Sequence, residues 1–423
     1  MMTTSVRLIS VLSCSLAMIA ILAMPARARA DDARDKRWHE DLDVLAKGIA
    51  EKAKPLQDDA AKRKAFLDAV AQLDKNVSRK TDEEIYVGIM KVLALTGDSH
   101  TSVSFGESGP HRYPVQIYWF AEGVYVTKAA EGYEQLLGAR LVRIGNLPIE
   151  RALVQLASMV PHENDSVFKA FAPHFLTFGE VLKGMNIVSD STQARFVFRR
   201  DNGKKIAITL GPVSEKAKWI SFAMKGLRYA HADRNYWFQY LADSNSLYFQ
   251  YQRCIEMKSA PFAQFQQQLL NSLDANPVKR LIIDLRDNLG GNSELLDPFI
   301  EVLAKRNSSA HPLPLYALIG RITFSSGALN AVDLKLKAHA IFVGEPSGAK
   351  PNHYGEVNML ELPNSHLKVF YSTMYWRPWP SDSDSTLNPD ITIRESWKDF
   401  AASEDPTLNA VLAGPKRFEP APR

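Results

Sequence analysis

Three loops of this sequence combine residue types that can do chemistry, and each follows a short apolar run typical of a β-strand. They cover residues 284–292, 323–327 and 344–352. In open sheets of largely parallel strands, ligands bind at the carboxyl edge, in the loops that lead into helices. We therefore expect the three loops to share one edge of a sheet.

The loop at 323–327 offers a serine hydroxyl as a nucleophile. Ser325 is expected where a strand has ended and a helix begins, and the free N–H groups at a helix start favour a developing negative charge. Serine is also the ordinary residue for capping a helix, so this loop by itself leaves both roles open. Ser326 is the register alternative for the nucleophile, although its backbone N–H is more useful for binding an oxyanion.

The loop at 284–292 contains two adjacent glycines, Gly290 and Gly291. Adjacent glycines allow a sharp turn that points N–H groups outward, as an anion-binding cradle requires. We interpret both as oxyanion-hole candidates. A plain tight turn between a strand and a helix is the alternative.

Two residues could act as the general base. Lys350 follows Ser325 by the span of one helix and one strand, which returns it to the same edge of the sheet. A lysine acts as a base only when neutral, so its pKa must be lowered by desolvation or by positive potential. His100, in the turn 97–101, needs no large pKa shift, and Ser99 could orient it. A solvated loop lysine and a surface histidine are the alternatives.

Several other chemistries are not indicated. The sequence contains no Gly-x-Ser-x-Gly elbow, no phosphate-binding loop ending Gly-Lys-Ser/Thr and no His-Glu-x-x-His. It contains no Cys/His cluster with metal-ligand spacing. Attack by a serine needs no metal or organic cofactor. Cys254, in a strand-like run, is interpreted as a buried structural thiol.

The elements beyond residue 240 alternate between strand and helix. The predicted strands are 246–250, 280–285, 315–319 and 340–343, and the predicted helices are 261–273, 293–305 and 326–337. Short apolar strands alternating with helices of this length are typical of an α/β domain with a largely parallel sheet. We assign residues 216–405 to this domain and residues 406–423 to a Pro-rich C-terminal tail.

Two further modules are predicted before the α/β domain. Residues 31–105 form an N-terminal helical module, in which a capping box at Thr81 begins a helix that ends near Gly97. Residues 106–215 form a compact β-rich module with an amphipathic helix and a hairpin pattern around Asn202-Gly203.

Residues 1–30 are typical of an export signal. Arg7 precedes an apolar stretch, and Ala28-Arg29-Ala30 matches the signal-peptidase pattern, so we expect cleavage after Ala30 and a periplasmic or secreted protein. An uncleaved membrane anchor is the alternative. Removing the arginines of the signal brings the formal net charge of +4 close to balance. That balance gives no reason to expect nucleic acid or an anionic membrane as a partner.

The three loops and the turn together resemble the carboxyl-terminal-processing (tail-specific) peptidases and their tricorn-like relatives. Residues 281–291 resemble the family's Asp-Leu-Arg-x-Asn-x-Gly-Gly strand and loop, and residues 97–101 resemble its Asp-x-His-Thr turn. Residues 323–325 fall on its Thr-Ala-Ser, and residues 343–350 on its Val-Gly-Glu-x-Thr-x-Gly-Lys. The order and spacing agree over roughly residues 80–395.

The resemblance implies a crotonase/ClpP-like catalytic domain and a PDZ-like module at 106–215 that captures a peptide tail by strand addition. It implies a serine endopeptidase that acts on peptides or unfolded proteins through an acyl-enzyme, with Ser325 as nucleophile and Lys350 as base. A catalytically inactive peptide- or apolar-ligand-binding protein on the same fold, and an esterase using the same serine, are the alternatives.

Two departures from the family pattern bear on the base. Ala328 stands where the processing peptidases carry a glutamate three residues after the nucleophile, and Lys350 is not followed by the usual Gly-x-x-Gln. The tricorn-like branch uses a histidine preceded by serine, which Ser99 and His100 match. We expect Lys350 to be the base, with His100 as the second candidate.

Overall fold

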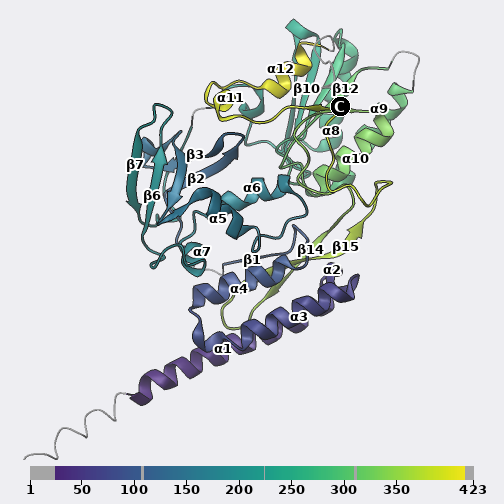
Figure 1. Ribbon diagram of the computed structural model, residues 1–423. Coiled ribbons are helices and arrows are strands. Elements are labelled where there is room, and N and C mark those ends of the chain that lie inside the picture. Colours follow the sequence, from purple (N-terminus) through teal and green to yellow (C-terminus); the bar gives the residue numbers. More distant parts are fainter. Residues whose placement is uncertain (1–23, 106–108, 223, 309–311, 415–423) are drawn as a thin grey trace, which may run out of the picture.

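The structure is a computed structural model that describes residues 24–105, 109–222, 224–308 and 312–414 (Figure 1). The predicted export signal lies mostly outside the described residues, whose first helix begins at Met24. Among the described residues, no helix combines the length and the apolar character that a membrane span requires.

The N-terminal part is helical, as predicted. Its helices are α1 (Met24–Lys52), α2 (Lys54–Gln57), α3 (Ala60–Asp74), η1 (Val77–Arg79) and α4 (Asp82–Ala94). The predicted capping box is present: the Thr81 hydroxyl accepts the Glu84 N–H, and the Glu84 carboxylate accepts the Thr81 N–H. This reciprocal cap fixes the start of α4. Helix α4 ends three residues before the turn that begins at Gly97.

A second part is built around an antiparallel sheet with the order β2-β3-β4-β6-β7, with β5 paired to β4 and β8 paired to β3. The strands are β2 (Val115–Phe120), β3 (Gly123–Ala130), β4 (Arg140–Ile144), β5 (Leu147–Pro148), β6 (Ala194–Arg199), β7 (Lys205–Leu210) and β8 (Trp219–Ser221). The helices are η2 (Glu134–Leu136), α5 (Ile149–Leu156), α6 (Asp165–Phe175) and α7 (Gly179–Gly184). The predicted hairpin is β6–β7, which pairs in antiparallel register around Asn202 and Gly203.

The third part contains a sheet of order β16-β13-β12-β11-β10-β9 among the described residues. Its strands are β9 (Tyr236–Leu241), β10 (Ser246–Tyr251), β11 (Arg280–Asp284), β12 (Leu315–Ile319), β13 (Ile341–Gly344) and β16 (Ile391–Thr392). Strands β10 to β13 pair in parallel, and β9 pairs antiparallel to β10. The prediction of an α/β domain with a largely parallel sheet is confirmed.

Helices cover both faces of this sheet. The helices of this part of the chain are η3 (Leu227–Tyr229), η4 (Ala242–Ser244), α8 (Phe262–Ala275), η5 (Ser293–Leu295), α9 (Asp297–Asn307), α10 (Ser326–Ala338), α11 (Trp397–Ala401) and α12 (Pro406–Leu412). Of these, α11 packs instead against Phe120 and Tyr125 of the antiparallel sheet. One face shares its core with α8, α9 and α10, and the other packs against Leu408 and Val411 of α12. Buried Cys254 belongs to the first core, as expected of a structural thiol. The segment 406–423, which was predicted to be a tail, therefore begins with helix α12, and this helix packs against the sheet.

A third sheet joins the segment after α4 to the hairpin that follows β13. It has the order β1-β15-β14, with β1 (Ser102–Ser104), β14 (His353–Glu361) and β15 (Lys368–Trp376). Figure 1 shows the β14–β15 hairpin reaching from the α/β domain to the N-terminal helices. Asp41 of α1 accepts the N–H groups of Asn364 and Ser365 at the hairpin tip. The hairpin therefore fixes the turn before β1 beside the loop that precedes β14.

Candidate active site

The three predicted loops meet at the carboxyl ends of β11, β12 and β13. The Phe324 N–H donates to the Asn288 carbonyl at 2.9 Å, which joins the second loop to the first. The Gly348 N–H donates to the Thr323 carbonyl at 3.1 Å, which joins the third loop to the second. Backbone hydrogen bonds of this kind hold the loops in register, so the predicted common edge is confirmed.

Ser325 has a backbone conformation that side chains other than glycine rarely adopt, with φ 51° and ψ −131°. It occupies the N-cap position of α10, but its side chain makes no capping hydrogen bond. A strained backbone persists only where the surroundings enforce it, and such residues cluster at active sites. Ser325 is partly exposed, so its hydroxyl can meet a substrate. The helix-capping alternative for this serine is therefore not supported.

Gly290 lies directly against Ser325. A Cβ at Gly290 would stand 2.8 Å from the Ser325 Cβ and 3.2 Å from its Oγ, so only glycine fits. The Gly290 N–H, however, donates to the Asn288 Oδ1 at 2.9 Å. This bond corrects the prediction for Gly290, because a committed amide is not free to bind an oxyanion. Gly290 instead makes room for the serine.

Gly291 and Ser326 remain the candidates for the oxyanion hole. The Ser326 hydroxyl donates to the Gly291 carbonyl at 2.6 Å, which ties the two loops together. That bond makes Ser326 a poor nucleophile, because its hydroxyl proton is already engaged. The backbone N–H groups of Gly291 and Ser326 have no partner among the described residues. Free amides at the start of a helix suit a developing negative charge.

His100 packs against the residue that precedes Ser325. Its ring stacks on Phe324, the residue before Ser325, with centroids 4.4 Å apart. The His100 side chain is only 6% exposed, and neither ring nitrogen has a hydrogen-bond partner among the described residues. An unpartnered polar group at such burial costs stability. This cost indicates that the ring nitrogens of His100 have a functional role, in which they gain a partner.

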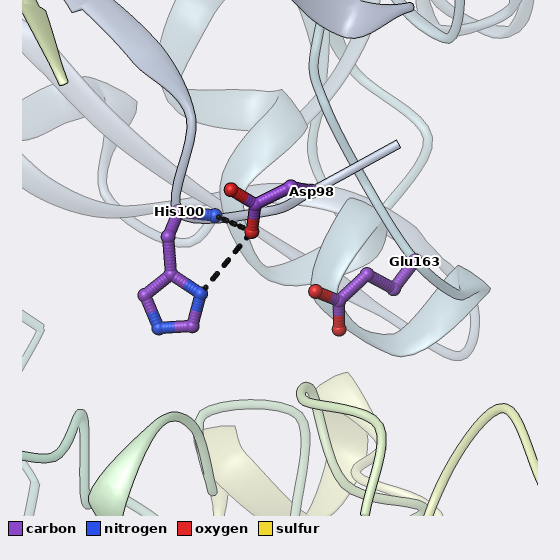
Figure 2. A group of neighbouring side chains, drawn as sticks. All are labelled: Asp98, His100 and Glu163. Atoms are coloured by element: carbon purple, nitrogen blue, oxygen red, sulfur yellow. Dashed lines mark hydrogen bonds and ion pairs between the residues drawn. The ribbon is translucent and has the colours of Figure 1, made fainter. Parts of the chain in front are cut away.

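Asp98 lies on the Nδ1 side of the imidazole, as Figure 2 shows. The Nδ1 atom of His100 stands 3.4 Å from Oδ1 of Asp98. The carboxylate is held by the His100 backbone N–H at 3.0 Å and by the Thr101 hydroxyl at 2.6 Å. Burial opposes ionisation of Asp98, but the His100 and Thr101 contacts outweigh it, so the pKa of Asp98 is lowered. A charged carboxylate therefore faces the imidazole.

Ser99 does not orient His100, contrary to the prediction. Its hydroxyl accepts the backbone N–H of Glu163 at 3.2 Å. The Glu163 carboxylate in turn accepts the Lys350 N–H at 3.1 Å and points toward Asp98 and His100 (Figure 2). Burial, helped by the charge of Asp98, raises the pKa of Glu163 to about 7. Ser99 thus positions Glu163, a residue that the sequence did not single out.

Lys350 reaches the site through its backbone. Its N–H binds Glu163, and its carbonyl accepts from Nδ1 of His353 at 2.8 Å. Within the described residues its ammonium group makes no hydrogen bond or ion pair. His353 lies parallel to His100 with centroids 5.7 Å apart, and burial, followed by the nearby His100, lowers the pKa of His353 to about 4. Of the two predicted bases, His100 has the better-defined placement next to the serine loop.

Three residues of the site were missed as functional candidates. Asp98 stands two residues before His100, and this spacing could have indicated an orienting carboxylate. Glu163 had no such signal, because it lies far from the other site residues in the sequence, whereas His353 stands three residues after Lys350 and could have been considered with it. Tertiary contacts alone bring them to His100.

Comparisons with known proteins show the fold. No family model and no curated protein matches this chain. The structure of mature CPAF complexed with lactacystin overlaps it with a TM-score of 0.64 at 12% identity, covering 90% of this chain and 97% of that chain. Mature CPAF alone overlaps with a TM-score of 0.62 at 12% identity, over 90% and 96% of the two chains. The photosystem II D1 C-terminal processing protease overlaps with a TM-score of 0.39 at 14% identity, over 84% and 92%.

At 12% identity the overlap with mature CPAF shows a shared fold. The chain has a mixed helix and sheet architecture that it shares with CPAF over nearly its whole length.

Proposed function

We propose that this protein is a serine peptidase with Ser325 as its nucleophile. The observation that carries the proposal is the strained conformation of Ser325, whose uncapped hydroxyl lies against Gly290. A buried imidazole stacks on Phe324, the residue directly before it. A helix-capping serine needs neither the strain nor the glycine. A nucleophile needs both, because the substrate must approach the hydroxyl closely.

We propose His100 as the general base, in preference to Lys350. The imidazole is buried next to the serine loop, has a nitrogen without a partner, and faces the charged carboxylate of Asp98. A carboxylate beside Nδ1 favours the tautomer that leaves Nε2 free to accept a proton, and it stabilises the imidazolium that then forms. Lys350 has none of these supports.

The proposed reaction proceeds through an acyl-enzyme. Ser325 Oγ attacks the peptide carbonyl while His100 takes its proton, and the N–H groups of Gly291 and Ser326 bind the oxyanion. The imidazolium then protonates the leaving amine. A water molecule, activated by the same imidazole, hydrolyses the ester and regenerates the serine.

We propose that residues 1–30 direct export, with cleavage after Ala30, and that the enzyme acts on peptides or unfolded proteins outside the cytoplasm. We also propose that the α/β domain is crotonase/ClpP-like and that the β-rich module is PDZ-like and captures a peptide tail by strand addition. The antiparallel sheet of that module supports the PDZ-like assignment. The apolar stretch after Arg7 and the Ala28-Arg29-Ala30 pattern support export.

Labelling with a fluorophosphonate, followed by peptide mapping, tests the nucleophile. We expect a single label on Ser325 that disappears in Ser325→Ala. The Ser326→Ala variant should still accept the label, because the Ser326 hydroxyl of the wild type is bound to the Gly291 carbonyl. Label on Ser326 would overturn the assignment of the nucleophile. Absence of label from folded protein would favour the inactive binding protein. Turnover of small esters without cleavage of any peptide would favour the esterase.

A further inference from the structure

Asp98, His100 and Glu163 have the composition and spacing of a metal site. Each offers one ligand atom, and these atoms all lie within 4.8 Å of one another. Figure 2 shows the two carboxylates and the imidazole converging on a common space from two separate segments of the chain. One imidazole with two carboxylates, completed by water, is a ligand set that suits Zn²⁺.

The spacing of the first two ligands already matches a tetrahedral ion. Ligand atoms about 2.0–2.1 Å from a tetrahedral Zn²⁺ lie roughly 3.3–3.4 Å apart. The measured separation between His100 Nδ1 and Asp98 Oδ1 is 3.4 Å. The two atoms face each other as an ion pair, and Nδ1 remains buried without a hydrogen bond among the described residues.

The electrostatics of the cluster favour a cation. Two carboxylates converge with no arginine or lysine paired to either of them among the described residues, and the Asp98 side chain is completely buried. Charges so placed repel each other strongly in a medium that water does not screen. A divalent ion would neutralise both carboxylates and fill the coordination of the imidazole at once.

Outer contacts hold the ligands in place. Thr101 and the His100 N–H fix the Asp98 carboxylate, and the Lys350 N–H fixes that of Glu163. Hydrogen bonds of this kind orient metal ligands and tune their affinity. Glu163 is only partly buried, which leaves a path by which an ion can enter.

We propose that Zn²⁺, or a divalent ion of the same class, binds Asp98, His100 and Glu163 and reversibly blocks the reaction. A metal at Nδ1 displaces the proton of the neutral imidazole to Nε2, so no lone pair remains to accept the proton of Ser325. The binding step stands by itself, whereas the block rests on the proposed function.

Binding is measured by equilibrium dialysis of the EDTA-treated mature chain against Zn²⁺, with Co²⁺ as a spectroscopic probe of four-coordinate binding. We expect about one ion per chain, and at least about tenfold weaker binding in His100→Ala and in Glu163→Gln. The matched control is His366→Ala, because His366 Nδ1 meets Glu361 at 3.0 Å in an exposed pair of the same residue types. Equal binding by the wild type and both site variants would overturn the proposal, as would an equal loss in His366→Ala.

Circular dichroism verifies that the variants fold. If the variants do not fold, nitrogen NMR of the unsubstituted protein tests the site. Zn²⁺ must shift the His100 Nδ1 resonance and leave Nε2 protonated. An unchanged His100 spectrum would overturn the site. In parallel, Zn²⁺ must slow fluorophosphonate labelling of Ser325, and EDTA must restore it. Metal-free protein that takes no label would count against the peptidase, without affecting the binding result.

Discussion

Two groups of buried charges in this protein are built in opposite ways. In the first, which we call the arginine network, each guanidinium is paired with two carboxylates. Arg228 pairs with Asp287 and Glu395, and Arg286 pairs with Asp284 and Asp405. The network links the sheet of the α/β domain to the segments before α11 and α12.

The second group is the cluster of Asp98, His100 and Glu163, where acids converge without an arginine. The consequences for protonation are opposite. Burial disfavours ionisation of Glu395 and Asp405, but the paired arginines outweigh it and lower the pKa of each to about 2. Burial raises the pKa of Glu163 to about 7. Paired charges thus stabilise the fold, whereas poorly paired ones are available for proton transfer or for a ligand.

The sharpest test of this comparison is the loss of the base. His100→Ala should slow fluorophosphonate labelling of Ser325 by about 10²–10⁴-fold, the usual contribution of a general base. Lys350→Ala should slow it by less than about tenfold, because its ammonium group makes no hydrogen bond or ion pair among the described residues. The rate constants of labelling at fixed pH measure both. The opposite order would restore Lys350 as the base.

Breaking the arginine network should instead reduce stability. Arg286→Met leaves Asp284 and Asp405 without their partner, and such a loss in a buried pair costs about 3–5 kcal/mol of unfolding free energy. Urea unfolding measures it. The matched control is Arg377→Met, since the Arg377–Asp382 pair is 66% and 45% exposed and should cost about 1 kcal/mol or less.

The same network has a defined acid response. Because the folded pKa of Asp405 is about 2 and lies below its ordinary value of 3.8, its stabilisation is present above that ordinary value and is lost as the pH falls toward 2. The difference in unfolding free energy between the wild type and Arg286→Met should therefore shrink as the pH falls across this range. A difference that stays constant from pH 5 to pH 2, roughly the window of these pKa values, would contradict the assignment.

Glu163 should show the opposite pH dependence. Its folded pKa of about 7 lies above the ordinary 4.5, so the folded state retains a proton that the unfolded chain has lost. Stability of the metal-free wild type therefore falls as the pH rises from about 4.5 to 7. Glu163→Gln removes this penalty, and its unfolding free energy should gain on the wild type by about 1–3 kcal/mol across the window. Parallel stability curves for the two proteins would contradict the raised pKa.

The smallest effect is expected at Ser99. Ser99→Ala removes one hydrogen bond, from the Glu163 N–H to the serine hydroxyl, and should cost about 1 kcal/mol in urea unfolding. Labelling of Ser325 should change by less than about tenfold, because the Ser99 hydroxyl makes its hydrogen bond with Glu163 and none with the imidazole. A loss as large as that of His100→Ala would show that Ser99 does position the base.

The elements of the α/β domain could be predicted closely from the sequence. The predicted strand at 315–319 matches β12, and the predicted helix at 326–337 matches α10 to within one residue. The predicted helix at 293–305 is in fact the short η5 followed by α9, because Pro298 stands in the first turn of α9 and favours a new helix start there. Strand and helix periodicities are local properties of the chain, which is why such predictions succeed.

The sequence by itself therefore determined the three loops and Ser325 at their common edge, since parallel strands that follow one another must end on one side of the sheet. Only the tertiary structure decided which base meets that serine. The pairing of β1 with β15 brings His100 to Phe324, and the segment before α6 brings Glu163 to His100 and Lys350. Contacts between such distant segments depend on how whole modules bury their surfaces together, and no local pattern of residues encodes that.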